Sequence, residues 1–185
     1  LKVTIMKLFK LEGHRLYISE EAYILKPFKT IWNRDKSKDK SNAIMELGYI
    51  YFMIDPRSDY QMYIDEDIRH QEIIQGVGMD KNWKPDKVVL EGIEFYKKFL
   101  PISALLLQDT RVAVDKLRTL LKEIDLMQVD DKGKPIYTLN VITSTIKQIP
   151  SLVKELDEAE RALAKDLTQE ENVRGARTKN MLEDD

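Results

Sequence analysis

The stretch from Ser103 to Met127, SALLLQDTRVAVDKLRTLLKEIDLM, decides the fold class. Its apolar residues alternate spacings of four and three, which places them on one face of an α-helix. We therefore expect a long amphipathic helix with one continuous apolar seam. The seam consists of Leu106, Thr110, Ala113, Leu117, Leu120, Ile124 and Met127.

A second segment of the same kind, 138–167, follows the turn residues Asp130 to Pro135. Because the connection is short, the two seams most simply meet as an antiparallel helical hairpin. Pro150 lies inside the second segment, so we expect it to bend or divide that helix. Glu160 interrupts a seam that otherwise consists of Ile142, Ile146, Ile149, Val153, Leu156, Leu163 and Leu167.

Shorter helices are expected upstream. One begins after Ser19 and restarts at Pro27, another covers Ala43 to Ile54, a third covers Asp65 to Gly76, and a fourth opens at Pro85-Asp86. The second of these is apolar nearly all round at its C-terminal end, which indicates a helix buried at the centre of the fold or between subunits.

Residues 2–18 hold the only plausible strands, since Val3 and Ile5 alternate with polar residues and Glu12-Gly13 supplies a turn signal. The predicted fold is therefore mainly α, a helical bundle with a long antiparallel helical hairpin and a small N-terminal β-hairpin. We expect a single helical domain over 1–170. The C-terminal tail, 171–185, has few apolar residues and is expected to be flexible or ordered by a partner.

Composition excludes several classes of function. Of the 185 residues, 34% are charged and none is cysteine, which excludes disulfide scaffolds, cysteine-ligated zinc and thiol catalysis. The net charge of −2 argues against a protein that coats DNA by bulk electrostatics. No apolar run approaches the ~20 residues that a membrane span needs, so we expect no membrane contact.

No catalytic, cofactor-binding or metal-ligating residue can be assigned from the sequence. His14 and His70 lie in unlike contexts without metal-ligand spacing, and no glycine-rich phosphate loop is present. Asp55, Asp59 and Asp65 could bind Mg²⁺ in a metal-dependent nuclease, but turn and cap roles explain them better. We therefore expect a protein that is not an enzyme.

A basic run beside a tryptophan is the first candidate surface for a partner. It comprises Trp32, Arg34, Lys36, Lys38 and Lys40. Asp35 and Asp39 interrupt the positive charge, and this favours a solvated loop or a salt-bridged contact to a neighbouring subunit over a contact to phosphate.

Aromatic residues give the second candidate surface. Tyrosines crowd the region 49–63, and tyrosine is enriched in protein interfaces because it buries a large area and keeps a polar tip. Core packing alone would also explain most of them. Tyr51 and Tyr60 are the better candidates for an interface.

Half of the chain resembles a known class of proteins. The stretches Lys26–Lys40 (KPFKTIWNRDKSKDK) and Glu46–Tyr60 (ELGYIYFMIDPRSDY), echoed by Trp83–Asp86 (WKPD), are similar to structural proteins of tailed bacteriophages, in particular the crAss-like phages of gut bacteria. The resemblance covers about residues 6–98. It implies a virion protein that is assembled in the host cytoplasm, and it assigns no catalytic residue.

A helical virion protein of this size looks most like a ring or adaptor subunit of the phage neck, which connects the portal and capsid to the tail. The expected partners are copies of the same chain, the portal and tail components, and DNA through non-specific contact in the channel. A basic front half, with 11 Lys/Arg against 8 Asp/Glu in residues 1–60, and an acidic remainder would suit such an assembly. The alternative is a cytoplasmic helical adaptor or regulator that binds a phage or host protein.

Overall fold

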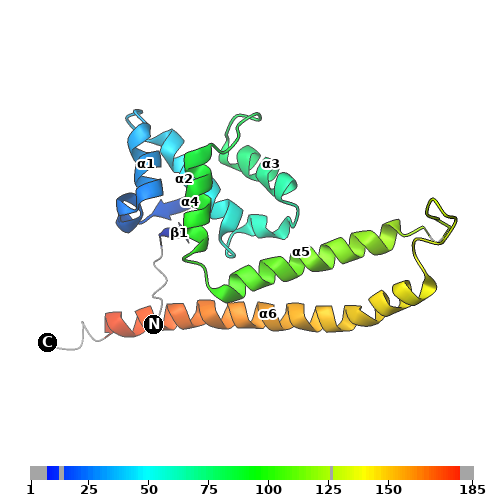
Figure 1. The fold of residues 1–185 in the computed structure, drawn as a ribbon. Coiled ribbons are helices and arrows are strands. Elements are labelled where there is room, and N and C mark those ends of the chain that lie inside the picture. The colour runs from blue at the N-terminus through cyan, green and yellow to red at the C-terminus, as the bar shows by residue number, and fades with distance from the viewer. Residues whose placement is uncertain (1–7, 13–14, 126, 180–185) are drawn as a thin grey trace. The chain divides into compact units, whose positions relative to one another are not determined.

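The structure is a computed structural model that describes residues 8–12, 15–125 and 127–179. Figure 1 shows a mainly helical chain with a small sheet near its N-terminus, as predicted. The chain divides into two compact units, residues 1–100 (unit 1) and 101–185 (unit 2), where the sequence indicated one domain over 1–170. The boundary falls at Leu100-Pro101, because Pro101 is the N-cap of a new helix.

The β-hairpin predicted within 2–18 is present. Strands β1 (Phe9–Glu12) and β2 (Arg15–Ile18) form a two-stranded antiparallel sheet. Val3 and Ile5, on which the prediction relied, lie outside the described residues.

Phe9 attaches this sheet to the core of unit 1. It pairs with Ile18 across the sheet and is fully buried. Its ring centroid lies 5.6 Å from that of Phe28 and 5.1 Å from that of Tyr96, both in edge-to-face geometry. Such pairs stabilise a core beyond the area that they bury.

Helices make up the rest of unit 1. In chain order they are η1 (Glu20–Ile24), α1 (Lys26–Arg34), α2 (Ser41–Ile54), η2 (Asp59–Met62), α3 (Glu66–Val77) and α4 (Lys87–Lys97). Helix α2 packs against α1, α3 and α4, and most of its side chains are buried. Of the two positions predicted for this helix, the structure shows the one at the centre of the fold.

Three of the sequence signals at the helix ends act as expected, whereas Ser19 makes no side-chain cap hydrogen bond to the helix that follows it. Pro27 occupies the first turn of α1, where its missing N–H costs no hydrogen bond. Asp65 caps α3 by accepting from the N–H groups of Asp67 and Ile68, at 2.9 and 3.0 Å. Gly78 ends α3 in the left-handed conformation, with φ +81°.

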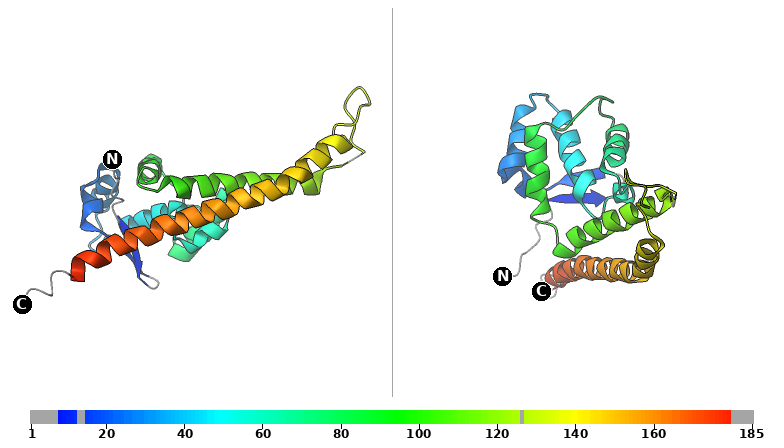
Figure 2. Two further views of the ribbon diagram at one scale, coloured as in Figure 1. Left: turned by 90° about the horizontal axis from the view of Figure 1, so that it is seen from below. Right: turned by 45° about the vertical axis from the view of Figure 1, so that its right-hand side comes forward.

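Unit 2 is the predicted antiparallel helical hairpin, formed by α5 (Ile102–Glu123) and α6 (Leu139–Lys179). Figure 2 shows the two helices side by side in two further views. The buried apolar residues between them are Ala104, Leu107, Ala159 and Leu163. Within the described residues, no helix of either unit has the length and apolar content needed to cross a bilayer.

The predicted seams of the hairpin are wrong in part. Leu106 and Leu120 of α5, and Ile146 and Val153 of α6, are exposed, while Leu107 faces the partner helix. Each helix carries two neighbouring apolar stripes, and a pair of helices can bury only one narrow stripe of each. Periodicity alone does not say which stripe meets the partner.

The ends of the hairpin also differ from prediction. Helix α5 stops at Glu123 rather than near Met127, because Asp125 accepts a hydrogen bond from the backbone N–H of Met127 at 2.9 Å and starts a turn. Helix α6 runs through Pro150 without division, although its N-terminal part, drawn in yellow, curves (Figure 1). Its backbone is helical through Lys179, which includes residues predicted as a flexible tail.

Candidate protein interaction surfaces

The basic run beside Trp32 lies in the connection between α1 and α2. Arg34, the last residue of α1, forms ion pairs with Glu46 of α2 and with Asp86, the N-cap of α4. The Arg34 guanidinium and the backbone N–H groups of the α4 N-terminus lower the pKa of Asp86, although partial burial opposes this. Arg34 therefore joins three helices of unit 1 and is not a free partner-binding residue.

Asp35 organises the same connection. Its carboxylate accepts hydrogen bonds from the backbone N–H groups of Ser37 at 2.8 Å and Ala43 at 2.9 Å. The Ser37 hydroxyl beside it and these two N–H groups lower the pKa of Asp35 to about 2. Asp35, which was expected to interrupt the positive charge of the basic run, thus holds the first turn of α2 in place.

Lys40 closes the connection. It has φ +56°, and its Nζ donates to the backbone oxygens of Trp32 at 3.2 Å and Asp35 at 2.5 Å. The same Nζ lies 5.6 Å from the centre of the Trp32 ring, within cation–π range. Trp32 is half-buried against Tyr23, with ring centroids 4.3 Å apart.

These contacts leave two lysines of the run directed to solvent. Lys36 is exposed and reaches only the backbone oxygen of Asn33, at 2.9 Å, while Lys38 is exposed. The part of the basic run that is free to meet a partner is therefore narrower than the sequence indicated. Lys36 and Lys38 form its centre.

The assignment of Tyr51 to an interface is corrected by the structure. Its side chain is only 2% exposed, and its ring packs against Phe9 and Phe52. Burial raises the pKa of the Tyr51 phenol to about 12. Tyr60 is half-buried, and its hydroxyl occupies the space that a side chain at Gly76 would need. The Tyr51 ring is therefore not available as an interface anchor, whereas the assignment of Tyr60 to an interface stays a prediction.

Of the three acidic residues considered for a metal site, Asp55 and Asp65 have structural roles and Asp59 is exposed. Asp55 is fully buried and accepts from the Arg57 guanidinium at 2.8 and 2.6 Å and from the Tyr96 hydroxyl at 2.5 Å. Asp65 caps α3. Among the described residues, no three histidine or acidic side chains come close enough to hold a metal ion.

Sequence reasoning missed the buried cluster of Asp55, Arg57 and Tyr96. Burial and the neighbouring carboxylate raise the pKa of the Tyr96 phenol far above its ordinary value. Asp55 and Arg57 are two residues apart. At that spacing directly after a helix, a pair of charged residues indicates only a turn. Tyr96 comes from α4, 41 residues away, so no local pattern could have joined it to them.

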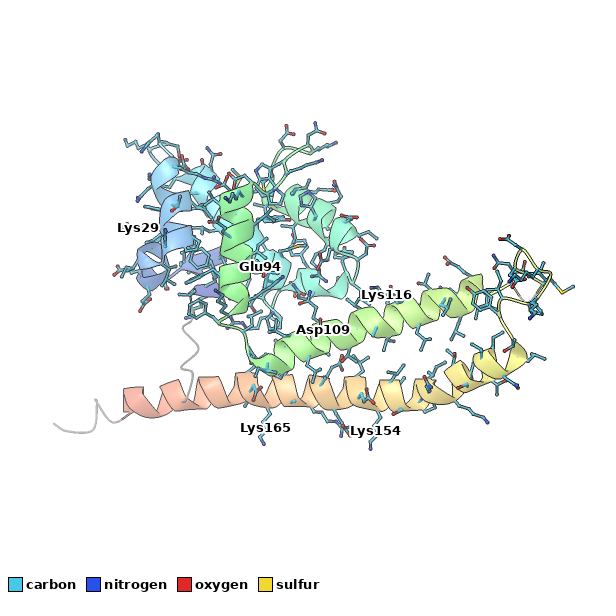
Figure 3. All side chains as sticks on the ribbon, viewed as in Figure 1. Lys29, Glu94, Asp109, Lys116, Lys154 and Lys165 are labelled. Carbon is cyan, nitrogen blue, oxygen red and sulfur yellow. The ribbon has the colours of Figure 1, made fainter. Side chains whose placement is uncertain are left out.

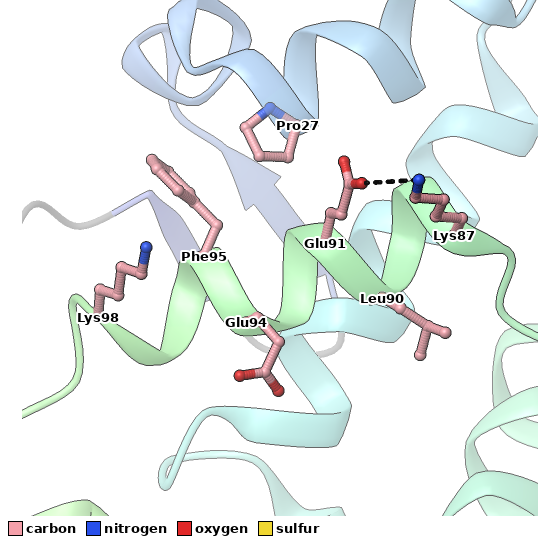
Figure 4. Close-up of a pocket in the computed structure, with 7 residues that line it drawn as sticks. All are labelled: Pro27, Lys87, Leu90, Glu91, Glu94, Phe95 and Lys98. Carbon is pink, nitrogen blue, oxygen red and sulfur yellow. Dashed lines mark ion pairs between the residues drawn. The ribbon is translucent and has the colours of Figure 1, made fainter.

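A shallow groove of about 410 Å³ lies on α4 (Figure 4). Pro27, Leu90 and Phe95 supply its apolar surface. Charged residues of both signs border it, and two of them, Lys87 and Glu91, form an ion pair with each other at 4.0 Å. The mixture of charges and the open shape indicate no particular ligand.

Unit 2 exposes a large amount of apolar surface. Among the described side chains of the hairpin, ten large apolar ones are each at least 41% exposed. They are Ile102, Leu106, Leu120, Met127, Val129, Ile136, Leu139, Val141, Ile146 and Val153. Between the helices, a groove of about 380 Å³ is lined by Val114, Leu117, Leu121, Ile149, Leu152 and Val153, with Arg118 and Lys122.

The exposed apolar residues concentrate where α6 begins. Residues 139–153 contain one charged residue, Lys147, whereas residues 154–168 contain eight. The second half has an ordinary solvated outer surface, on which Lys154 and Lys165 project away from α5 (Figure 3). The first half lacks such a surface, so it is the candidate for contact with another protein.

Comparison of the chain with protein-family models, with curated proteins and with solved structures finds no match.

Proposed function

We propose that this chain is a structural subunit that works by packing against other protein subunits, specifically as a virion protein in an oligomeric ring of the neck of a tailed phage. In this role it connects the portal and capsid to the tail. The exposed apolar surface of the α5–α6 hairpin is the observation that carries the proposal.

A hairpin of two helices has too few neighbours to bury its apolar stripes. Stable domains cover such stripes with a further layer of helix or sheet. Here the described contacts between α5 and α6 bury only four apolar side chains, two from each helix, while ten stay exposed. An exposed apolar surface of this extent is typical of an interaction site. We therefore infer that protein partners cover it.

The assignment to a phage particle rests on the sequence resemblance. The similar region, about residues 6–98, coincides with unit 1. We infer that unit 1 is the folded body of the subunit and that the hairpin supplies contacts between subunits. Lys36 and Lys38 would add a polar contact to an acidic patch of a neighbour.

The experiment combines two measurements. Native mass spectrometry and negative-stain electron microscopy of the purified chain are expected to show a closed ring with one defined copy number. Mass spectrometry of purified phage particles is expected to detect the chain in fixed proportion to the portal protein.

A chain that stays monomeric at high concentration and is missing from particles would overturn the proposal. If that chain instead formed a defined complex with one phage or host protein, the adaptor alternative would replace it.

A further inference from the structure

Two polar contacts mark opposite edges of the α5–α6 hairpin. Arg111 pairs with Glu160 at 2.9 Å, and the Ser103 hydroxyl donates to Asp166 at 2.5 Å. Glu160 and Asp166 are about 120° apart around α6, because each residue advances a helix by about 100°. The buried Leu163 lies midway between them, about 60° from each, so the two contacts flank the buried side of α6.

The edge with Arg111 and Glu160 defines what we call the basic face. Moving back from Glu160 in steps of seven residues, α6 presents Val153, Ile146 and Leu139, all of which are exposed. Moving forward from Arg111 by seven and eleven residues, α5 presents Arg118 and Lys122, also exposed. This face combines an apolar line on α6 with a basic line on α5.

The edge with Ser103 and Asp166 defines the acidic face. Here α5 presents Leu106 and Leu120, with Ala113 halfway between them, and all three are exposed. Eleven residues before Asp166, three turns of helix, α6 presents the exposed Glu155. This face combines an apolar line on α5 with acidic residues on α6.

We infer that the basic face of one copy packs against the acidic face of the next copy, an inference that rests on the proposed function. When α6 of one copy lies on α5 of the next, apolar lines meet apolar lines, and Arg118 and Lys122 come near Glu155. Pairing two basic faces, or two acidic faces, would bring like charges together and is disfavoured. A contact between unlike faces leaves one free face at each end, so it repeats from copy to copy.

The size of one face suits a stable contact. Helix α5 has 22 residues, which gives a length of about 33 Å. Two packed helices are roughly 20 Å wide, so a face covers on the order of 650 Å². A standard protein interface buries about 800 Å² on each partner. One face of the hairpin thus supplies most of the area that an interface between two copies needs.

The test uses two variants of the full chain that each damage one face at exposed positions. Leu139→Glu with Ile146→Glu puts negative charge into the apolar line of the basic face. Leu106→Lys with Leu120→Lys puts positive charge into the apolar line of the acidic face. Sedimentation velocity and native mass spectrometry report association, and circular dichroism reports folding.

Each variant alone is expected to be a folded monomer at concentrations about tenfold or more above those at which the wild type assembles. A mixture of the two is expected to associate, because the intact basic face of one variant meets the intact acidic face of the other. The control, Lys147→Gln with Lys154→Gln, changes the net charge by the same two units as the glutamate pair but alters α6 outside the apolar line. It is expected to assemble like the wild type.

Four results would overturn the inference. If one variant still dimerises alone, the contact joins like faces. If both variants assemble normally, or if their mixture stays monomeric while the wild type assembles, the contact uses another surface and the proposed function stands without it. If the wild type itself does not assemble, the inference fails, and detection of the chain in purified particles decides the proposed function separately.

Discussion

At the scale of single residues, a buried carboxylate holds unit 1 together. Asp55 satisfies both of its oxygens with Arg57 from the turn after α2 and Tyr96 from α4. A buried charge is stable only while its partners remain, so removal of one member leaves the others without compensation.

We predict that Asp55→Ala lowers the free energy of unfolding by about 3 kcal/mol. This value is the lower end of the range for a broken buried ion pair, because the partner Arg57 is partly exposed and keeps some contact with water. Tyr96→Phe removes a single hydrogen bond to a charged group and is expected to cost about 1.5 to 3 kcal/mol. Urea unfolding followed by circular dichroism measures both. A loss below about 0.5 kcal/mol in Asp55→Ala, no larger than an ordinary surface substitution produces, would show that the cluster is not structural.

Asp35 gives a prediction about pH. Its pKa is lowered from the ordinary 3.8 to about 2, so the folded state favours the ionised form. The stabilisation is fully present above pH ~4 and is lost as the pH falls through 2. We expect the wild type to exceed Asp35→Asn in urea midpoint at pH 6, and this difference to shrink between pH 4 and pH 2. A difference that stays constant down to pH 2 would contradict the role of the carboxylate.

The sequence predicted the local roles of residues better than the long-range ones. Asp65 and Gly78 act through backbone groups within one turn of helix, so their types alone indicate what they do. Tyr51, by contrast, was assigned to an interface because its type is common there. Its burial depends on Phe9, which comes from a strand 42 residues earlier.

At the scale of elements, the two faces of α5 differ in what they stabilise. Leu107 is buried against α6, whereas Leu120, one of the residues predicted to form the seam, is 41% exposed. The hairpin itself could be predicted, because periodicity and a short connection suffice for it. The rotation of each helix could not, since it depends on which of two similar stripes packs better.

We predict that Leu107→Ala lowers the stability of the monomeric hairpin by about 2 to 5 kcal/mol, while Leu120→Ala costs less than about 1 kcal/mol there. Thermal unfolding at a dilution where the chain is monomeric measures the difference. At high concentration Leu120→Ala is expected to weaken association instead. Equal losses from the two substitutions in the monomer would mean that the seam predicted from the sequence is the buried one.

At the scale of the whole molecule, the free lysines of the connection between α1 and α2 can be separated from the structural ones. We predict that Lys36→Glu with Lys38→Glu impairs assembly and leaves the subunit folded, because these two side chains face solvent. Assembly yield and circular dichroism measure the two effects. Lys81→Glu with Lys84→Glu, an equal change of charge at exposed sites of the same unit, is the control.

If the variant of Lys36 and Lys38 forms normal particles, the connection between α1 and α2 does not contribute to the contact between subunits. If the particles assemble but fail to retain or eject DNA, the two lysines instead contact the phosphates of DNA in the channel.

We expect unit 2 to reach full stability only when another copy of the chain covers it. Anything that binds the folded state alone stabilises it in proportion to its concentration. The stability of α5 and α6 should then rise with protein concentration, and that of the well-covered helix α2 should not.

Hydrogen exchange followed by mass spectrometry, at concentrations below and above assembly, tests this claim most directly. The expected result is amide protection in α5 and α6 that increases on assembly, with protection in α2 high and unchanged. Amides of the hairpin that are as protected as those of α2 in the dilute monomer would contradict the account.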